Sequence, residues 1–466
     1  MRLLLVEDDP EVVAVFEVEF AAGTAILDHA GCRDDAMAVL AGSSFDAVVC
    51  DLRIPSTDGA LDDDVAHGRA VLTTILETHP GTPIIAFSAY GTVEIMQDLL
   101  RRARQEDFLG EGTPREMLVF YSKDQLPDCV ALLHGFAESV ETLGQIEIAV
   151  GLANIQLPWE DERILRVYAR RLGASVVRVS PLTGGLSGSR VLRLRLEAAG
   201  AHVASVVAKL DTVAAVCDEQ HRVETLVAPV LPSGSYPSAV TLLRAGAGSR
   251  GGIFYRFAGG YDRSLFDAVA GGAGAEVVAA VRQLTEPWRE GAPVEQLNLE
   301  TIRNSLVQSA DLPQDLQGAV RSDESVEVSA RRCTTHGDLH LFNVLVPDDG
   351  QPMIIDFAAV GSRPASVDPV TLELSMIFHP DAREVCGEWP STEQAEHWDD
   401  LNSYVDGCPH PDFIRACRLW AFEVAAGDRE VFASLYAYSV RQLKFEDTPH
   451  AIALALVACA RRRLGA

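Results

Sequence analysis

Short apolar runs alternate with stretches of helical period over the first 140 residues, and this alternation limits the possible folds more than any other feature of the chain. Such alternation is typical of parallel βα units. The predicted strands are Leu3–Val6, Ala25–Leu27, Ala47–Cys50, Ile84–Phe87 and Met117–Tyr121. We therefore expect an α/β doubly wound, five-stranded parallel sheet, whose ligands bind beyond the carboxyl ends of the strands.

Reactive side chains follow four of these five strands. They are Glu7, Asp8 and Asp9 after the first, Asp51 after the third, Ser88 after the fourth and Lys123 after the fifth. Clustered carboxylates bind Mg²⁺ through oxygen, and the cation offsets the charge of a phosphoryl group arriving on Asp51. Lys123 and Ser88 would contact the phosphoryl oxygens. Acids after a single strand would indicate only a helix cap, but four strand ends together favour a phospho-acceptor site.

The first 140 residues resemble the response-regulator receiver family, which has a flavodoxin-like fold. The matching segments are Val6-Glu7-Asp8-Asp9, Asp51-Leu52-Arg53-Ile54-Pro55, Ser88-Ala89-Tyr90-Gly91 and Lys123. The resemblance implies that Asp51 is the phospho-acceptor. It also implies that Asp8 and Asp9 bind Mg²⁺ together with Asp51, and that Ser88 and Phe120 form the switch pair supported by Lys123.

Two features depart from the receiver pattern. Asp124 stands where the family usually has a proline, and the loop Ser56–Ala66 is longer and more acidic than usual. Partners implied by the resemblance are a histidine kinase or another phosphodonor, with further protein partners or a homodimer formed through the receiver.

A second motif, Thr335-His336-Gly337-Asp338-Leu339-His340-Leu341-Phe342-Asn343, joins a polar loop to a strand. Eighteen positions after Asp338, another predicted strand ends at Asp356. Phosphoryl transfer needs a carboxylate that accepts the proton of the attacking hydroxyl, and oxygen ligands for Mg²⁺. Asp338 suits the first role, and Asn343 with Asp356 suits the second. We expect His336 and His340 to hold the loop by hydrogen bonds rather than to bind a metal.

A glycine-rich turn lies upstream of this motif, between two predicted strands. The nucleotide-binding candidates in it are Gly184, Gly185, Ser187 and Gly188. Alone, the turn is explained equally well by a β-hairpin. Lys209, one of only three lysines in the chain, follows in a strand and would hold nucleotide phosphates, oriented by Glu219 or Glu224.

The second half resembles the aminoglycoside phosphotransferase and choline kinase-like superfamily over roughly 290 residues, with His336-Gly337-Asp338 through Asn343 as the strong motif. The resemblance implies a two-lobed α+β protein-kinase-like domain that uses Mg²⁺ with ATP or GTP. The expected domains are a receiver over 1–145, a linker helix over 146–173 and a kinase-like domain over 174–466, with an N-lobe to about 257 and a C-lobe from about 258.

Composition limits the partners. A formal net charge of −28 argues against nucleic acid, because binding to phosphate backbones requires clustered lysine and arginine. No apolar run approaches the roughly 20 residues of a membrane span, so we expect no membrane insertion and a cytoplasmic protein.

The sequence leaves three functions open. The first is a Mg²⁺-dependent transfer of phosphate from nucleotide to the hydroxyl of a small molecule, governed by Asp51. The acidic segments Glu393–Asp400 and Asp406–Asp412 would suit a cationic acceptor, although charge runs are usually solvated faces. The second is phosphorylation of a protein hydroxyl. The third is a non-catalytic nucleotide-binding pseudokinase or scaffold whose receiver docks partner proteins.

Overall fold

The computed structural model describes residues 1–21, 23, 25–89, 104–151, 156–182, 188–257, 259–314, 317, 324–348 and 351–465. They form two compact units. The first comprises Met1–Asp218 with Ala239–Phe257, and the second Glu219–Ser238 with Ala258–Ala466. Within the described ranges, no helix is both long enough and apolar enough to cross a lipid bilayer.

A five-stranded parallel sheet begins the first unit, and its strands follow the order β2-β1-β3-β4-β7. They are β1 (Arg2–Val6), β2 (Ile26–Ala30), β3 (Ala47–Cys50), β4 (Ile84–Phe87) and β7 (Leu118–Tyr121). The doubly wound sheet expected from the sequence is therefore confirmed, with β2 extending three residues beyond its predicted end.

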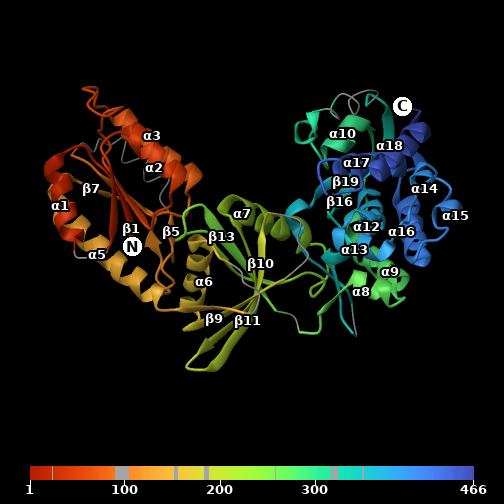
Figure 1. Ribbon diagram of the computed structural model, residues 1–466, viewed down its shortest axis with the longest axis horizontal. Helices are drawn as coiled ribbons and strands as arrows, with labels where there is room; N and C mark the ends of the chain where they lie inside the picture. The colour runs from red at the N-terminus through yellow and green to blue at the C-terminus, as the bar shows by residue number, and fades with distance from the viewer. Residues whose placement is uncertain are drawn as a thin grey trace. The chain divides into compact units, whose positions relative to one another are not determined.

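Helices cover both faces of this sheet (Figure 1). They are α1 (Pro10–Phe20) and α5 (Leu126–Gly144) on one face, and α2 (Arg33–Gly42) and α3 (Val65–Thr78) on the other. Successive strand residues point to opposite faces, so Leu3 and Leu5 pack with α1 and α5, and Leu4 packs with α2 and α3. The helical period of residues 92–104 predicts a further helix, and this stretch lies outside the described residues except for Arg104.

A six-stranded sheet with the order β12-β13-β11-β10-β9-β8 follows in the same unit. Its strands are β8 (Glu147–Val150), β9 (Val176–Pro181), β10 (Arg190–Ala198), β11 (Ala201–Thr212), β12 (Ala239–Leu243) and β13 (Arg250–Arg256). Helix α6 (Trp159–Arg171) packs against it: the Tyr168 ring stacks on Phe254 at 3.7 Å between centroids. The segment expected to be a linker thus contributes a strand and a helix to this N-lobe sheet, and the exact domain boundaries stay a prediction.

One apolar core joins the receiver sheet to the N-lobe sheet. The same cluster of buried side chains contains Phe16 of α1, Phe136 of α5, Tyr168 of α6 and Leu192 of β10. Phe108 also belongs to it, from a segment that includes the short strands β5 (Gln105–Glu106) and β6 (Arg115–Glu116). The receiver and the N-lobe are therefore packed together as one unit.

Polar contacts reinforce this junction. The Gly81 amide donates to the Gly248 carbonyl and the Gly246 amide donates to the Gly81 carbonyl, both at 2.7 Å. Ion pairs join Arg163 to Asp46 at 2.7 Å and Arg171 to Asp107 at 3.1 Å. Asp46 and Gly81 lie just before strands β3 and β4, so the N-lobe contacts the amino ends of these receiver strands.

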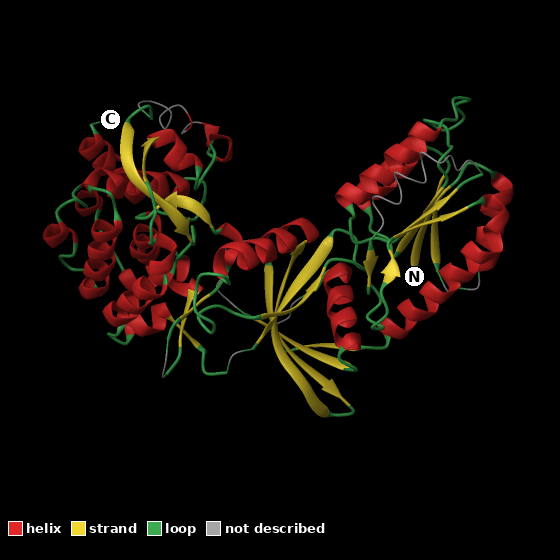
Figure 2. Cartoon of the chain, turned by 180° about the vertical axis from the view of Figure 1, so that it is seen from behind, coloured by secondary structure: helices red, strands yellow, loops and turns green. Residues whose placement is uncertain are grey.

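Helices dominate the second unit (Figure 2), as the change from a strand-rich to a helix-rich sequence predicts. The described helices are α8 (Leu265–Ala270), α9 (Gly274–Leu284), α10 (Leu299–Asn304), α12 (Val367–Phe378), α13 (Pro380–Cys386), α14 (Thr392–Glu396), α15 (Leu401–Tyr404), α16 (Pro411–Val424), α17 (Asp428–Gln442) and α18 (His450–Leu464), and α7 (Val213–Arg222) spans both units.

Two small sheets position the catalytic-loop motif in this unit. They are β14 (Arg263–Ser264), β17 (Val344–Val346) and β18 (Met353–Ile354), and β15 (Val294–Asn298), β16 (Glu327–Thr335) and β19 (Gly361–Pro364). Strand β16 ends at the start of the loop that contains Asp338, and β17 begins directly after Asn343.

The junction can be tested at Gly246, whose φ of 95° favours glycine and where a Cβ atom would clash with the Phe108 carbonyl oxygen. Gly200 is a matched control, because its φ is 79° but a Cβ there meets nothing within 4 Å. We expect Gly200→Ala to lower the free energy of unfolding by about 1–2 kcal/mol through backbone strain alone. Gly246→Ala should lower it by at least about 1 kcal/mol more, since overpacking adds to the strain.

Urea unfolding followed by circular dichroism measures both variants. Limited proteolysis should also cut Gly246→Ala faster within residues 104–116. Equal losses of stability in the two variants would show that the hairpin between β12 and β13, which contains Gly246, does not stabilise the junction with the receiver.

Candidate functional site

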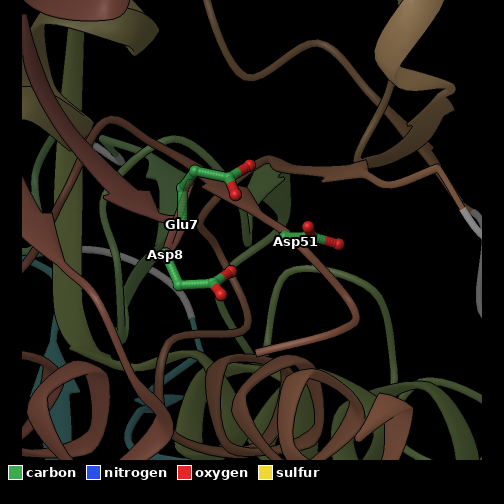
Figure 3. Close-up of side chains that lie close together, drawn as sticks. All are labelled: Glu7, Asp8 and Asp51. Carbon is green, nitrogen blue, oxygen red and sulfur yellow. The ribbon is translucent and has the colours of Figure 1, made fainter. Parts of the chain in front are cut away.

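Three carboxylates converge at the carboxyl ends of β1 and β3 (Figure 3). Glu7, Asp8 and Asp51 each offer an oxygen, and these oxygens lie within 4.8 Å of one another. Glu7 is fully buried and Asp51 is 4% exposed, whereas Asp8 faces solvent. The parallel strands produce this convergence because all their carboxyl ends meet at the same edge of the sheet.

Lys123 neutralises part of this negative charge. Its Nζ lies 2.8 Å from Glu7 Oε1 and 2.7 Å from Asp51 Oδ2. Burial opposes the charge on Lys123, but the hydrogen bonds to Asp51 and Glu7 outweigh it and raise the pKa of the lysine. Burial raises the pKa of Glu7 to about 7, even though Lys123 acts in the opposite direction.

The donor set fits a divalent cation. Glu7 Oε2 is buried and has no hydrogen-bond partner among the described residues, so one carboxylate oxygen is left for a ligand. Together with Asp8 and Asp51 it supplies only hard oxygen donors, which Mg²⁺ prefers.

Asp9, expected from the sequence to be a metal ligand, lies outside this group. Its Oδ1 accepts a hydrogen bond from the Glu11 amide at 2.9 Å and caps α1, and its own amide donates to Glu7 Oε1 at 3.0 Å. Pro10 at the first helical position could have indicated this, because the residue before such a proline is the natural N-cap. Glu7 takes the position in the acidic group that we expected for Asp9.

The expected switch residues lie on β4 and β7. Ser88 directly follows β4 and is fully buried, and its amide donates to the Tyr121 carbonyl at 3.1 Å. Phe120 is half-buried and packs against the core under α2 and α3. Asp124, the departure from the receiver pattern, is exposed, and the preceding Ser122 forms a capping box with Gln125. The roles of Ser88 and Phe120 stay predictions.

The catalytic-loop motif is held in the second unit by hydrogen bonds. Asp368 of α12 accepts from the amides of His336 at 2.8 Å and Gly337 at 2.9 Å. His336 Nε2 contacts the Ile355 carbonyl at 3.0 Å and so ties the loop to the residue before Asp356. Both contacts agree with the expectation that His336 supports the loop.

Asp338, Asn343 and Asp356 are brought together by main-chain contacts. Asn343 Nδ2 donates to the Asp338 carbonyl at 2.9 Å, and the Ile355 amide donates to the Asn343 carbonyl at 3.0 Å. Asp356 has a φ of 65°, a conformation that a non-glycine residue adopts only where its surroundings enforce it. Asn343 and Asp356 carry oxygen donors of the kind that Mg²⁺ prefers, and their role as metal ligands stays a prediction.

Arg441, at the end of α17, contacts the expected catalytic base. Its Nη1 lies 2.8 Å from Asp338 Oδ1. Burial disfavours the charge on Asp338, but Arg441 and the nearby histidines hold the pKa of that carboxyl below its usual value. Burial also lowers the pKa of His340 to about 4, so this imidazole is neutral at pH 7. Neither Arg441 nor Asp368 was identified from the sequence, because Asp368 lies 32 residues from His336 and Arg441 lies 103 residues from Asp338.

The nucleotide-binding candidates are only partly described. Gly184, Gly185 and Ser187 lie outside the described residues, whereas Gly188 is exposed just before β10. Lys209 is buried on β11 in the first unit, and Glu219 is buried on α7 in the second. Glu224 is exposed and accepts a hydrogen bond from Gln220 at 2.7 Å. The choice between Glu219 and Glu224 as the partner of Lys209 stays open.

A pair of variants tests the acidic group. We expect Glu7→Gln to raise the Mg²⁺ concentration needed for phosphorylation of Asp51 by acetyl phosphate at least about tenfold, because a buried carboxylate next to the cation is lost. Asp9→Asn should change it less than about twofold, since asparagine also caps helices well. A phosphate-affinity gel run over a Mg²⁺ series measures both. Equal effects of the two substitutions would indicate that Asp9 also binds the cation.

Comparisons with known proteins match two separate parts of the chain. Residues 3–118 match the family model of the response regulator receiver domain, and residues 178–385 match that of the phosphotransferase enzyme family. Comparison with curated proteins found no match.

Solved structures match each part with low identity. The receiver domain of a Francisella response regulator is 16% identical and covers 30% of this chain and 98% of its own, with a TM-score of 0.23. An aminoglycoside phosphotransferase from Streptomyces rimosus is 19% identical, with coverages of 55% and 96% and a TM-score of 0.31. A choline kinase from Cryptosporidium parvum is 10% identical, with coverages of 62% and 89% and a TM-score of 0.35. Over residues 3–118 the chain thus matches a response regulator receiver domain, and over residues 178–385 it matches a domain of the phosphotransferase enzyme family.

Proposed function

We propose that this chain is a two-component-type signalling protein in which phosphorylation of Asp51 regulates a Mg²⁺-dependent, nucleotide-using phosphotransferase. A histidine kinase or another phosphodonor would supply the phosphoryl group. The observation that carries the transferase is the arrangement of the loop at Asp338. The main-chain carbonyl of Asp338 accepts a hydrogen bond from Asn343, and Asn343 and His336 are hydrogen-bonded to Ile355, the residue before Asp356.

In the transfer step, the carboxylate of Asp338 accepts the proton of an acceptor hydroxyl. The acceptor oxygen then bonds to the γ-phosphorus of ATP or GTP, and the nucleoside diphosphate leaves. Asn343 and Asp356 would hold Mg²⁺, which offsets the charge of the nucleotide phosphates when it is bound. Lys209, oriented by Glu219 or Glu224, would contact the same phosphates together with the glycine-rich turn that ends at Gly188.

Regulation through the receiver is supported by the shared core. The receiver and the N-lobe bury one continuous set of apolar side chains, so a rearrangement at Asp51 reaches the N-lobe through packed residues. Lys123 bridges Glu7 and Asp51 in the absence of phosphate. A phosphoryl group on Asp51 would draw Lys123 to its oxygens and alter that bridge.

A second candidate is a nucleotide-binding pseudokinase without turnover, whose receiver docks partner proteins. The ion pair between Arg441 and Asp338 favours it, because the guanidinium occupies one oxygen of the expected base.

Turnover separates the two candidates. We expect Asp338→Asn to lower Mg²⁺-dependent ATP or GTP turnover, measured with a panel of hydroxyl compounds and proteins, by roughly 10²- to 10⁴-fold, the usual contribution of a general base. Asp399→Asn is a matched control, since Asp399 also pairs with an arginine, Arg462, at 3.1 Å. It should retain turnover within about twofold, because that pair is partly exposed. Nucleotide binding without turnover in the wild type would favour the pseudokinase.

Coupling between the domains is tested with acetyl phosphate. We expect the treatment to change turnover in the wild type and to leave Asp51→Asn unaffected, because the variant lacks the phospho-acceptor oxygen. Asp128→Asn changes an exposed aspartate of α5 and should respond like the wild type. Acid-labile phosphate on the protein reports the modification independently. An identical response in Asp51→Asn would contradict regulation through this site.

A further inference from the structure

Arg441 places a positive charge where an acceptor hydroxyl would approach Asp338. Its side chain is 20% exposed and that of Asp338 is 31% exposed, so both can be reached from solvent. A guanidinium has five N–H donors. In the part of the chain that the structure describes, only one hydrogen bond of this side chain is seen, to Asp338 Oδ1 at 2.8 Å. The group therefore has donors available for a ligand.

Other arginines surround the same loop. Arg363 donates to the Ser305 carbonyl at 2.9 Å, and Arg222 donates to the Val360 carbonyl at 2.6 Å. Burial lowers the pKa of Arg363; the charges of Arg441 and Arg222 act in the same direction, and those of Asp368 and Asp338 oppose it. Arg441, Arg363 and Arg222 therefore lie near this loop together with its carboxylates, in a chain that carries a net charge of −28.

Some acids of the segments expected to suit a cationic acceptor form ion pairs or cap helices instead. Asp399 pairs with Arg462 at 3.1 Å and with Arg463 at 3.6 Å, both on α18. Asp400 accepts from Ser403 and caps α15. These acids stabilise the packing of short helices. The charge that lies against Asp338 is that of Arg441.

We propose that Arg441 determines specificity by binding an anionic group, a carboxylate or a phosphate, on the hydroxyl acceptor. The inference rests on the proposed transferase function. A guanidinium binds such oxyanions through two parallel hydrogen bonds, which a single contact to Asp338 does not provide. An anionic acceptor would draw Arg441 away from Asp338 Oδ1. That oxygen is then free to accept the hydroxyl proton as the acceptor oxygen bonds to the γ-phosphorus and the bond to the diphosphate breaks.

Acceptors that share a three-carbon skeleton and differ in charge test the assignment. Glycerate and glycerol 1-phosphate are anionic, glycerol is neutral and serinol is cationic. We expect wild-type kcat/KM with MgATP to favour the anionic compounds at least about tenfold, the discrimination that one charge-assisted hydrogen bond provides. Arg441→Gln should raise KM for the anionic compounds about 10- to 100-fold more than it raises KM for glycerol. Arg441→Lys should restore part of the loss.

Lys444→Gln is the matched control. It removes the same charge three residues further on, where Lys444 lies 3.9 Å from Asp311, and should leave the preference unchanged. A loss shared equally by all four compounds in Arg441→Gln would overturn the proposal, because it would mean that Arg441 only positions Asp338. A wild type without preference for anions would also overturn it.

Binding measured by calorimetry in the presence of Mg²⁺ and ADP decides the case in which no compound is phosphorylated. Binding of glycerate or glycerol 1-phosphate that is lost in Arg441→Gln and kept in Asp338→Asn supports the anion site, while the missing turnover counts against the transferase alone. If neither anion binds, the inference fails. Turnover without discrimination by charge rejects the inference and leaves the proposed function intact.

Discussion

The apolar core shared by the receiver and the N-lobe is the constraint on which the rest of the first unit depends. Phe16 and Phe136 from the receiver helices lie in the same buried cluster as Tyr168 and Leu192 of the N-lobe. Hydrophobic burial is the main favourable term in folding, so neither sheet reaches its full stability alone. This packing fixes α6 against β13. There Asp161 is fully buried and accepts hydrogen bonds from Arg190 at 2.8 Å and Arg250 at 3.0 Å.

Buried carboxylates in this protein are matched with cations of two kinds. Arginine holds the carboxylates that fasten elements, as in the pairs Arg303–Glu324 and Arg418–Glu373 inside the second unit. Its planar fork bonds both carboxylate oxygens in each pair. At the acidic rim of the receiver the cation is a lysine instead, and Lys123 reaches two carboxylates from one flexible stem. The flexible ammonium group of lysine suits a site where the bound anion changes. The rigid guanidinium of arginine suits a permanent ion pair.

The local sequence pattern predicted the receiver well. Each strand, and the reactive residue that follows it, can be recognised from a few neighbouring positions. The five-stranded parallel sheet and the convergence of Asp51 and Lys123 at one rim followed from this pattern. The assignment of Asp9 differed because a helix cap competes for the same acids. Arg441 and Asp368 could not be found this way: their contacts with Asp338 and His336 span 103 and 32 residues. The junction at Gly246 depends on tertiary packing that no local pattern encodes.

The hairpin between β12 and β13 docks at the amino ends of the receiver strands, and the acidic rim lies at their carboxyl ends. Exchange of one receiver for another during evolution would therefore preserve phosphorylation chemistry but not the fit to the N-lobe. Gly246 and Gly248 lie in the N-lobe and form backbone hydrogen bonds with Gly81. A side chain at Gly246 would also clash with the backbone at Phe108. The heritable module is consequently a receiver plus its matching hairpin, two segments more than 120 residues apart in the gene product that must change together.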